Sequence, residues 1–193
     1  MIVTAVRQGE DPAGYIRPEH PAQERVRRAM EEVTGAVHAE ANRATDGCSI
    51  PTYAVPVRKL AHGFARLATG TLPEGRREAA RRLLTACMNE PFHMAGTRRF
   101  CTRIMKALPG RLFAKTGAEG VFCGALPDLG LGIALKIDDG GTRASEAAMA
   151  NVAMRFLDDE ALLPFCERPL KNWNGWEVGS IVPTPALREL TRA

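Results

Sequence analysis

A lysine, a threonine and a glycine stand side by side at Lys115, Thr116 and Gly117, at the start of a stretch that alternates apolar and small residues. A strand lysine can take the proton of a nearby serine or anchor a carboxylate. The threonine adds a hydroxyl, and the glycine lets a substrate approach the backbone. Taken by themselves, these three residues favour an exposed strand lysine next to an ordinary hairpin turn. A catalytic lysine beside two substrate-binding residues is the alternative, as in the KTG motif of serine β-lactamases and penicillin-binding proteins.

A second group with chemical potential lies in DGCSIP, residues 46–51. Cys48 follows a glycine and precedes a loop bounded by proline, so its thiol can be held outward as a soft metal ligand. Asp46, two residues earlier, can hydrogen-bond a water on such a metal. The alternative is that Cys48 is a small buried apolar residue, which is the commoner role of a lone cysteine.

The other metal-binding residue types show no usable spacing. The sequence Asp138-Asp139-Gly140 resembles part of a calcium loop but lacks the remaining ligands, so we interpret it as a turn. The histidines form neither an HExxH motif nor any pair, and we assign them no chemical role: His20, His38, His62 and His93.

Helical spacing of apolar residues dominates the first half of the chain. PEHPAQERVRRAMEEVTG (18–35) has a proline in its first turn and a glycine stop, PVRKLAHGFARLATG (56–70) ends on a glycine, and LPEGRREAARRLLTACMNEP (72–91) lies between prolines. In the third helix the residues predicted to face inward are Ala80, Leu83, Leu84 and Cys87.

The apolar period then changes to that of strands. RLFAKT (111–116), GVFCGAL (120–126) and LGIALKI (131–137) are of strand length and are separated by turn residues, which predicts an antiparallel meander. RASEAAMANVAMRFLDDEALL (143–163) restores helical spacing and should return to cover one face of the sheet. The prediction is an α+β domain with an antiparallel sheet covered by helices. The tail RPLKNWNGWEVGSIVPTP (168–185) is expected to be an extended strand or arm that carries both tryptophans.

Composition excludes two classes of partner. The net charge of +4 comes from arginines spread along the predicted helices, and aromatic residues make up only 6% of the chain, so we expect no nucleic-acid binding. No apolar run reaches the roughly 18 to 20 residues of a membrane helix. Five widely spaced cysteines without a CxxC motif fit a reducing, cytoplasmic location.

Long stretches of the chain resemble the L-asparaginase II family, the rhizobial thermolabile type of asparaginase. The resemblance begins at GEDPAGYIRPEHPAQERVR (9–27) and covers nearly the whole chain. It continues through DGCSIPTYAVPVRKLAHGFARLATG (46–70), MAGTRRFCTRIMKALPGRLFAKTGAEGVFCGALPDLGLGIALKIDDG (94–140) and NWNGWEVGSIVP (172–183).

This resemblance implies a serine-β-lactamase-like fold, hydrolysis of L-asparagine to L-aspartate and ammonia, and a homodimer with a zinc ion beside the catalytic centre. The lysine of the family's KTG motif pairs with a catalytic serine, and that role maps onto Lys115. The family's DGC motif supplies one zinc thiolate, which maps onto Cys48, and an acidic partner of the zinc-bound water, which maps onto Asp46.

Other elements of the family pattern are missing. Members of the family are longer at the amino terminus, where they carry a Ser-x-x-Lys pair, a further catalytic serine, and a Cys-Ser-Gly-Lys-His stretch with two more zinc ligands. The serines present here are Ser49, Ser145 and Ser180, and none precedes a lysine by three. We therefore expect residues 1–193 to be a single partial domain, truncated at its amino terminus and inactive alone.

Two alternatives stay open at this point. The chain can be a non-catalytic remnant or a partner fragment of an intact asparaginase subunit. It can also be a penicillin-recognising or esterase-like hydrolase, since serine β-lactamases and penicillin-binding proteins also use KTG, although a shared fold says little about substrate.

Overall fold

The computed structural model describes residues 1–189, so the domain predicted over residues 1–193 lies in the described part except for its last four residues. Its strands are β1 (Arg43–Thr45), β2 (Pro51–Tyr53), β3 (Phe113–Thr116), β4 (Val121–Leu126), β5 (Leu131–Lys136), β6 (Arg168–Lys171) and β7 (Glu177–Ile181). Its α-helices are α1 (Ile2–Arg7), α2 (Pro21–Thr34), α3 (Val57–Thr69), α4 (Glu74–Asn89), α5 (Pro91–Ala95), α6 (Phe100–Ala107), α7 (Thr142–Leu157), α8 (Leu163–Cys166) and α9 (Pro185–Arg188).

The predicted helix ends are confirmed, and the reason is local. Helix α2 begins at Pro21, where the ring Nδ1 of His20 accepts a hydrogen bond from the Ala22 amide at 3.0 Å. It ends at Gly35, whose φ of 66° is the left-handed conformation that glycine adopts without a steric cost. Helix α3 ends in the same way at Gly70.

The meander is also confirmed. β3, β4 and β5 form an antiparallel sheet in the order β3-β4-β5, so β3 lies at an edge of this sheet. Helix α3 covers one face, where the ring of Phe64 stacks on Phe113 with the centroids 5.9 Å apart. Helices α6 and α7 cover the other face, where Phe100 meets Phe122 edge-on. The fold is therefore α+β.

One glycine sets the distance between α3 and the sheet. A Cβ atom placed on Gly132 of β5 would lie 1.9 Å from the carbonyl oxygen of Ala61 and 2.5 Å from the amide nitrogen of Ala65. No side chain fits there, so the helix backbone rests directly on the strand. This close packing fixes α3 against the sheet that carries Lys115.

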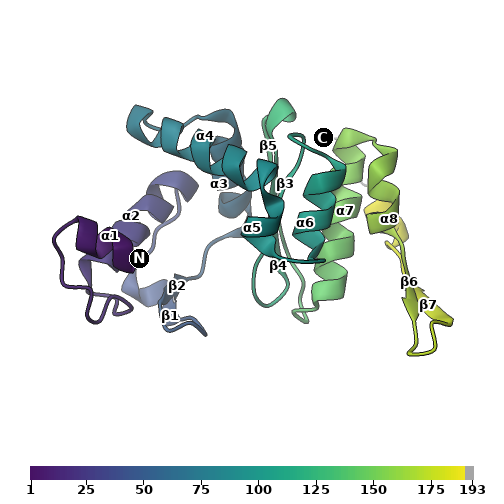
Figure 1. Cartoon of the computed structure of the whole chain (residues 1–193), viewed down its shortest axis with the longest axis horizontal. Coiled ribbons are helices and arrows are strands. Elements are labelled where there is room, and N and C mark those ends of the chain that lie inside the picture. Colours follow the sequence, from purple (N-terminus) through teal and green to yellow (C-terminus); the bar gives the residue numbers. More distant parts are fainter. Residues whose placement is uncertain (190–193) are drawn as a thin grey trace.

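The amino-terminal part of the chain forms a separate group of elements, which we call the amino-terminal lobe (residues 1–56). It contains α1, α2 and the β1–β2 hairpin, and Figure 1 shows it at one end of the long axis. Arg66 of α3 joins it to the rest, because its guanidinium donates to the carbonyl oxygens of Glu32 and Val33, the latter at 2.9 Å.

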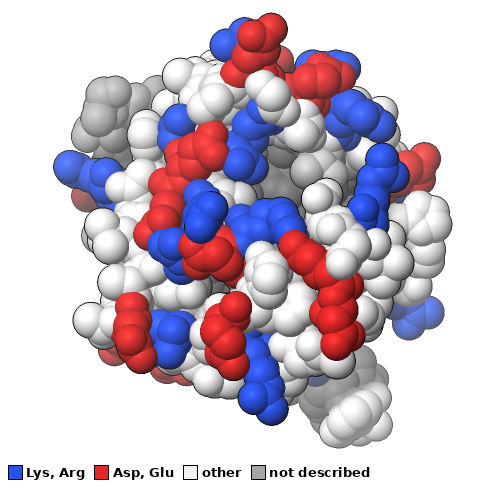
Figure 2. All heavy atoms as spheres, turned by 90° about the vertical axis from the view of Figure 1, so that its left-hand side faces the viewer, with Lys and Arg blue, Asp and Glu red and all other residues white. Residues whose placement is uncertain are grey.

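Charges of both signs alternate on the end of this lobe. Figure 2 looks at that end of the molecule and shows Lys and Arg side chains interleaved with Asp and Glu. Arg27 bridges Glu24 and Glu31, and Arg25 pairs with Glu10. No single sign dominates this face, in agreement with the prediction that the arginines are spread along the helices.

Two predictions need correction. Leu83 of α4 was expected to face inward, yet its side chain is 68% exposed, because α4 packs through Ala80, Leu84 and Cys87 and leaves its opposite side to solvent. The tail was expected to be an extended strand or arm, and it contains two strands, β6 and β7, that fold back on each other as a hairpin. No helix within residues 1–189 has the length and apolar character that crossing a bilayer requires.

Candidate functional site

Lys115 lies on the edge strand of the central sheet and points into solvent. Phe113 and Ala114 precede it in β3 and are buried, whereas Lys115 is exposed. Its Nζ donates a hydrogen bond to the Thr116 carbonyl oxygen at 2.6 Å. The burial changes within four residues, so the strand is anchored at one end and presents the lysine at the other.

Thr116 and Gly117 continue from the lysine into the turn that leads to β4. The Gly117 amide donates to the Val121 carbonyl at 2.7 Å, and the half-buried Thr116 lies opposite Phe122. A Cβ atom on Gly117 would lie 3.1 Å from the Val121 side chain. The turn alone therefore favours a glycine at residue 117. The glycine of the KTG motif thus has a structural role in addition to any catalytic one.

Two thiols lie close enough to Lys115 for its charge to act on them, and both stay protonated at neutral pH. Burial raises the pKa of the Cys123 thiol to about 11, and the positive charge of Lys115 opposes this only in part. Burial also raises the pKa of Cys101, against the opposing effects of the Thr116 backbone and Lys115. A neutral, buried thiol is a poor nucleophile, so neither cysteine supplies one for Lys115.

The three serines lie in environments that do not bring a hydroxyl to Lys115. Ser145 is buried in α7, where its Oγ donates to the Thr142 carbonyl at 3.0 Å. Ser49 is in the turn of the β1–β2 hairpin, and Ser180 is exposed on β7. Within residues 1–189 no serine hydroxyl is hydrogen-bonded to the lysine.

Asp46 and Cys48 lie together in the turn between β1 and β2. The Asp46 Oδ2 atom accepts hydrogen bonds from the Cys48 thiol at 2.9 Å and from the Cys48 amide at 3.3 Å. The thiol bond is the main reason why the pKa of Asp46 is lowered. Both residues are exposed. The prediction of an outward-facing thiol beside a carboxylate therefore agrees with the geometry of this turn.

These two residues do not by themselves fit a zinc ion. Zinc sites in proteins use three or four protein ligands. Among residues 1–189 no group of three or more His, Cys, Asp and Glu side chains lies close enough to hold a metal. The turn thus offers two donors and needs further ligands.

The two candidate motifs are not brought together by the fold. Figure 1 shows the β1–β2 hairpin in the amino-terminal lobe and β3 in the central sheet, with the chain passing through α3 and α4 between them. Lys115, Thr116 and Gly117 therefore form one candidate site, and Asp46 with Cys48 forms another.

The sequence interpretation missed a pocket beside Cys48. A surface pocket of about 430 Å³ lies between residues of α1 and the β1–β2 turn. The apolar run MIVTAV at the start of the chain is the signal that could have revealed it. The residues that line the pocket are Met1, Ile2, Val3, Tyr15, Cys48 and Ile50.

The histidines play structural parts. His38 is 1% exposed, its Nδ1 is 2.9 Å from the Ala36 carbonyl oxygen, and its ring meets Tyr53 edge-on. It joins the segment after α2 to the β1–β2 hairpin. His62 and His93 are exposed residues of α3 and α5.

Comparison with known proteins adds one finding. The family model for L-asparaginase II matches residues 1–183. A search of curated proteins finds no match to the chain. The matched range includes the KTG strand, the DGC turn and the β6–β7 hairpin.

Proposed function

The chain belongs to the L-asparaginase II family, and on this premise we propose that it takes part in hydrolysis of the side-chain amide of L-asparagine to L-aspartate and ammonia. The observation that carries the proposal is the family match over residues 1–183 of a 193-residue chain. The exposed Lys115 on the edge strand supports it, because a substrate can reach that lysine from solvent.

The proposed fold is serine-β-lactamase-like. An antiparallel meander with helices on both faces and a KTG lysine on its edge strand is the arrangement expected of the carboxy-terminal part of such a domain. The free edge of β3 presents backbone groups that a substrate or a further strand could pair with.

The proposed reaction is acyl transfer. A serine oxygen attacks the amide carbon, Lys115 orients the serine or accepts its proton, ammonia leaves, and water hydrolyses the resulting ester to release aspartate. Thr116 would donate its hydroxyl to the bound substrate, and Gly117 would leave the strand end open to it. Since the three serines of the chain are positioned elsewhere, we propose that the attacking serine comes from outside residues 1–193.

Asp46 and Cys48 are proposed as two of the groups around a zinc ion, with Asp46 also oriented toward substrate in the assembled site. The remaining ligands must come from outside residues 1–189, so no catalytic step is assigned to the metal here. We also propose a homodimer and a cytoplasmic location.

The zinc proposal makes a measurable prediction. Purified as residues 1–193, the protein should retain far less than one zinc ion per chain after dialysis, because Cys48 is the one zinc ligand of the expected three in this chain and a single thiolate holds zinc weakly. Elemental analysis measures the content. One tightly held zinc ion per chain that disappears in Cys48→Ala would contradict the expectation.

A non-catalytic partner subunit is the second candidate function. The observation that favours it is the separation of Lys115 from every serine in residues 1–189. In that case the chain would bind an intact asparaginase subunit and contribute no chemistry of its own.

One experiment separates the two candidates. Ammonia release from L-asparagine is measured for residues 1–193 alone, and again after mixing with the separately produced serine-bearing amino-terminal segment of an asparaginase II relative. We expect no release above the buffer control from the chain alone. We expect release from the mixture, lost when the chain carries Lys115→Met.

Each other outcome has a definite meaning. Release by residues 1–193 alone would show that no outside serine is needed. A stable complex that releases no ammonia would favour the non-catalytic candidate. Release that persists with Lys115→Met would remove the catalytic role of the lysine.

A further inference from the structure

Helix α6 packs against β3, the strand that carries Lys115, and begins directly after Arg99 (Figure 1). The backbone of Arg99 is extended, with φ of −65° and ψ of 147°. The Thr102 hydroxyl of α6 donates a hydrogen bond to the Gly96 carbonyl oxygen at 2.7 Å, which holds the preceding turn against the helix. Arg99 is therefore carried by a backbone that is fixed beside the sheet.

Two cations, Lys115 and Arg99, lie around one buried thiol. Cys101 is in the first turn of α6 and is 1% exposed. Burial raises the pKa of this thiol, and three groups oppose the effect: a hydrogen bond from the Thr116 backbone, the positive charge of Lys115 and the positive charge of Arg99. The packing of α6 on β3 thus brings Arg99 to the end of the strand where the KTG motif lies.

The guanidinium of Arg99 is free to bind a ligand. The residue is exposed, and within residues 1–189 its side chain has neither a hydrogen bond nor an ion pair. Two other basic residues at this end of the sheet are engaged elsewhere. Arg168 pairs with Glu146 at 2.8 Å, and Lys136 lies on β5, at the opposite edge, with its Nζ bonded to the Ile137 carbonyl.

The proposed reaction requires such a cation. Only the side-chain amide of L-asparagine reacts, so the α-carboxylate must be held in place to keep the amide carbon at the attacking serine. In that mechanism the ammonium group of Lys115 is engaged with the serine, and the carboxylate needs a different partner. A guanidinium suits this purpose, because it binds a carboxylate through two parallel hydrogen bonds and fixes its orientation as well as its distance.

We propose that Arg99 binds the α-carboxylate of the substrate, while Lys115 acts on the serine that attacks the side-chain amide. An asparagine inside a peptide chain has no free α-carboxylate, so Arg99 would make the site selective for the free amino acid. The inference rests on the proposed hydrolysis of L-asparagine and adds a specificity-determining residue to that site.

An NMR titration of residues 1–193 tests binding without catalysis. We expect the Nε–H signal of Arg99 to shift and saturate as L-asparagine is added at constant ionic strength. β-Alaninamide is the matched compound, because it keeps the amide and the amine but lacks the α-carboxylate, and it should leave the signal in place. An Arg99 signal that does not respond to L-asparagine would overturn the proposal.

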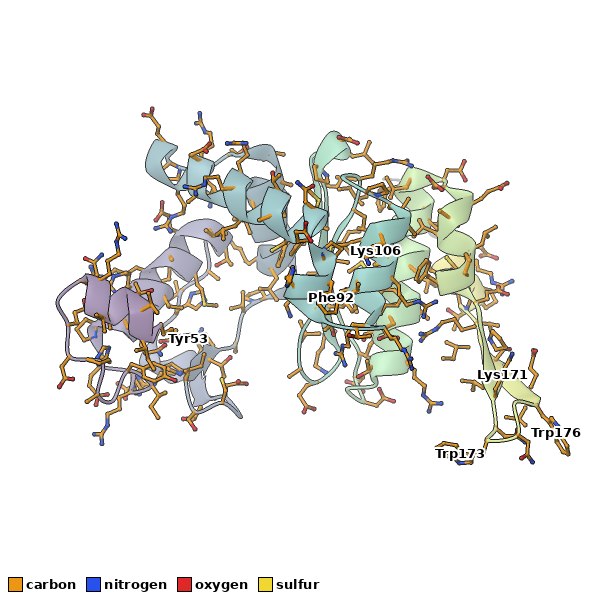
Figure 3. The ribbon with its side chains drawn as sticks, in the orientation of Figure 1. Tyr53, Phe92, Lys106, Lys171, Trp173 and Trp176 are labelled. Carbon is orange, nitrogen blue, oxygen red and sulfur yellow. The ribbon has the colours of Figure 1, made fainter. Side chains whose placement is uncertain are left out.

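Two variants complete the titration. In Arg99→Met, the accompanying shift of the Thr116 amide signal should disappear. In Lys106→Met it should persist, because this change removes an exposed cation from the same helix (Figure 3) without touching the guanidinium. The spectra also show whether each variant is folded.

Kinetics in the mixture with the serine-bearing segment give a second measurement. Arg99→Met should lower kcat/KM for L-asparagine by roughly 10- to 100-fold, mainly through KM, the effect of losing hydrogen bonds to a charged group. Hydrolysis of β-alaninamide should be equally slow with and without the change, since this substrate has no carboxylate to bind. Arg99→Lys should recover part of the loss, because it keeps the charge without the paired hydrogen bonds. Lys106→Met should alter neither substrate.

The outcomes separate this inference from the proposed reaction. If the mixture releases no ammonia while the Arg99 signal still responds to L-asparagine, the reaction is refuted and the carboxylate site stands. If Arg99→Met slows both substrates equally, the arginine has a structural role and the inference fails. It also fails if Arg99→Met hydrolyses L-asparagine with unchanged kcat/KM.

Discussion

At the scale of single residues, Lys115 combines an exposed ammonium group with a buried anchor. Its strand is held by Phe113 and Ala114, and its Nζ is bonded to the neighbouring Thr116 carbonyl. A side chain held in this way contributes little to the stability of the fold. Any role of Lys115 therefore lies in its interaction with a ligand or with a partner group. Its effect on stability and its effect on turnover can be measured separately.

Lys115→Met should change the free energy of unfolding by no more than about 0.5 kcal/mol, because the methionine side chain is similar in length to that of lysine and residue 115 is exposed. Thermal unfolding of residues 1–193 measures this. In the mixture that hydrolyses asparagine, the same change should lower turnover by roughly a hundredfold to ten-thousandfold. A marked loss of stability would instead identify Lys115 as a structural residue.

The buried thiol opposite Lys115 makes the fold sensitive to alkali. The pKa of Cys123 is raised from 9.0 to about 11 by burial, so in the unfolded chain this thiol loses its proton at a lower pH than in the folded one. The resulting stability is complete below about pH 9 and is lost as the pH rises through about 11, with a size on the order of 2 kcal/mol.

Chemical unfolding at a series of pH values between 8 and 11 measures this loss. In Cys123→Ala the decline should be shallower, although the variant starts from a lower stability because a small cavity is left. Groups that do not interact with residue 123 contribute equally to both curves and cancel in the comparison. Parallel curves for the two proteins would contradict the assignment.

At the scale of elements, the contact between α3 and β5 depends on the absence of a side chain at Gly132. Gly132→Ala should cost roughly 3 kcal/mol or more, because the new methyl group would meet the backbone of α3 and the helix would have to move. For a chain of this length, that loss lowers the melting temperature by roughly 6–12 °C.

The control for this variant is Gly75→Ala. Gly75 lies in the first turn of α4 with nothing within 4 Å of an added Cβ atom, so alanine should be neutral or stabilise by up to about 1 kcal/mol. Equal melting temperatures for the two alanine variants would show that the backbone of α3 does not rest directly on Gly132.

The elements differ in how far sequence could predict them. The ends of α2 and α3 followed from Pro21, Gly35 and Gly70, since a cap acts through the few residues beside it. The exposure of Leu83 did not follow, because the helix pattern gives a face and only tertiary packing decides what covers it. The separation of Cys48 from Lys115 could not be predicted either, because tertiary packing and not local sequence decides where the two motifs lie relative to each other.

At the scale of the whole molecule, Arg66 links the amino-terminal lobe to α3, the helix that packs on the sheet. Its guanidinium donates to the Val33 carbonyl at 2.9 Å and to the Thr71 carbonyl at 2.9 Å, and thereby joins the end of α2 to α3. Arg66→Ala should leave the part-buried carbonyls of Glu32 and Val33 without this donor and loosen the lobe.

Limited proteolysis measures that loosening. Cleavage within residues 1–56 should be severalfold faster in Arg66→Ala than in the unaltered protein, with the sheet still protected. Arg58→Ala, which removes an exposed arginine from the same helix, should leave the rate unchanged. Equal cleavage rates for both variants would show that α2 is held by other contacts.

The contact between Gly132 and α3 also bears on the order of events during synthesis. Helix α3 leaves the ribosome roughly 60 residues before β5 exists, which at the usual elongation rates is roughly 3–12 s. During that interval the apolar face of α3 has no sheet to rest on, while the β3–β5 meander needs only neighbouring residues to form. The nascent chain therefore passes through a period in which the apolar face of α3 is uncovered, and a slower ribosome would prolong that exposure.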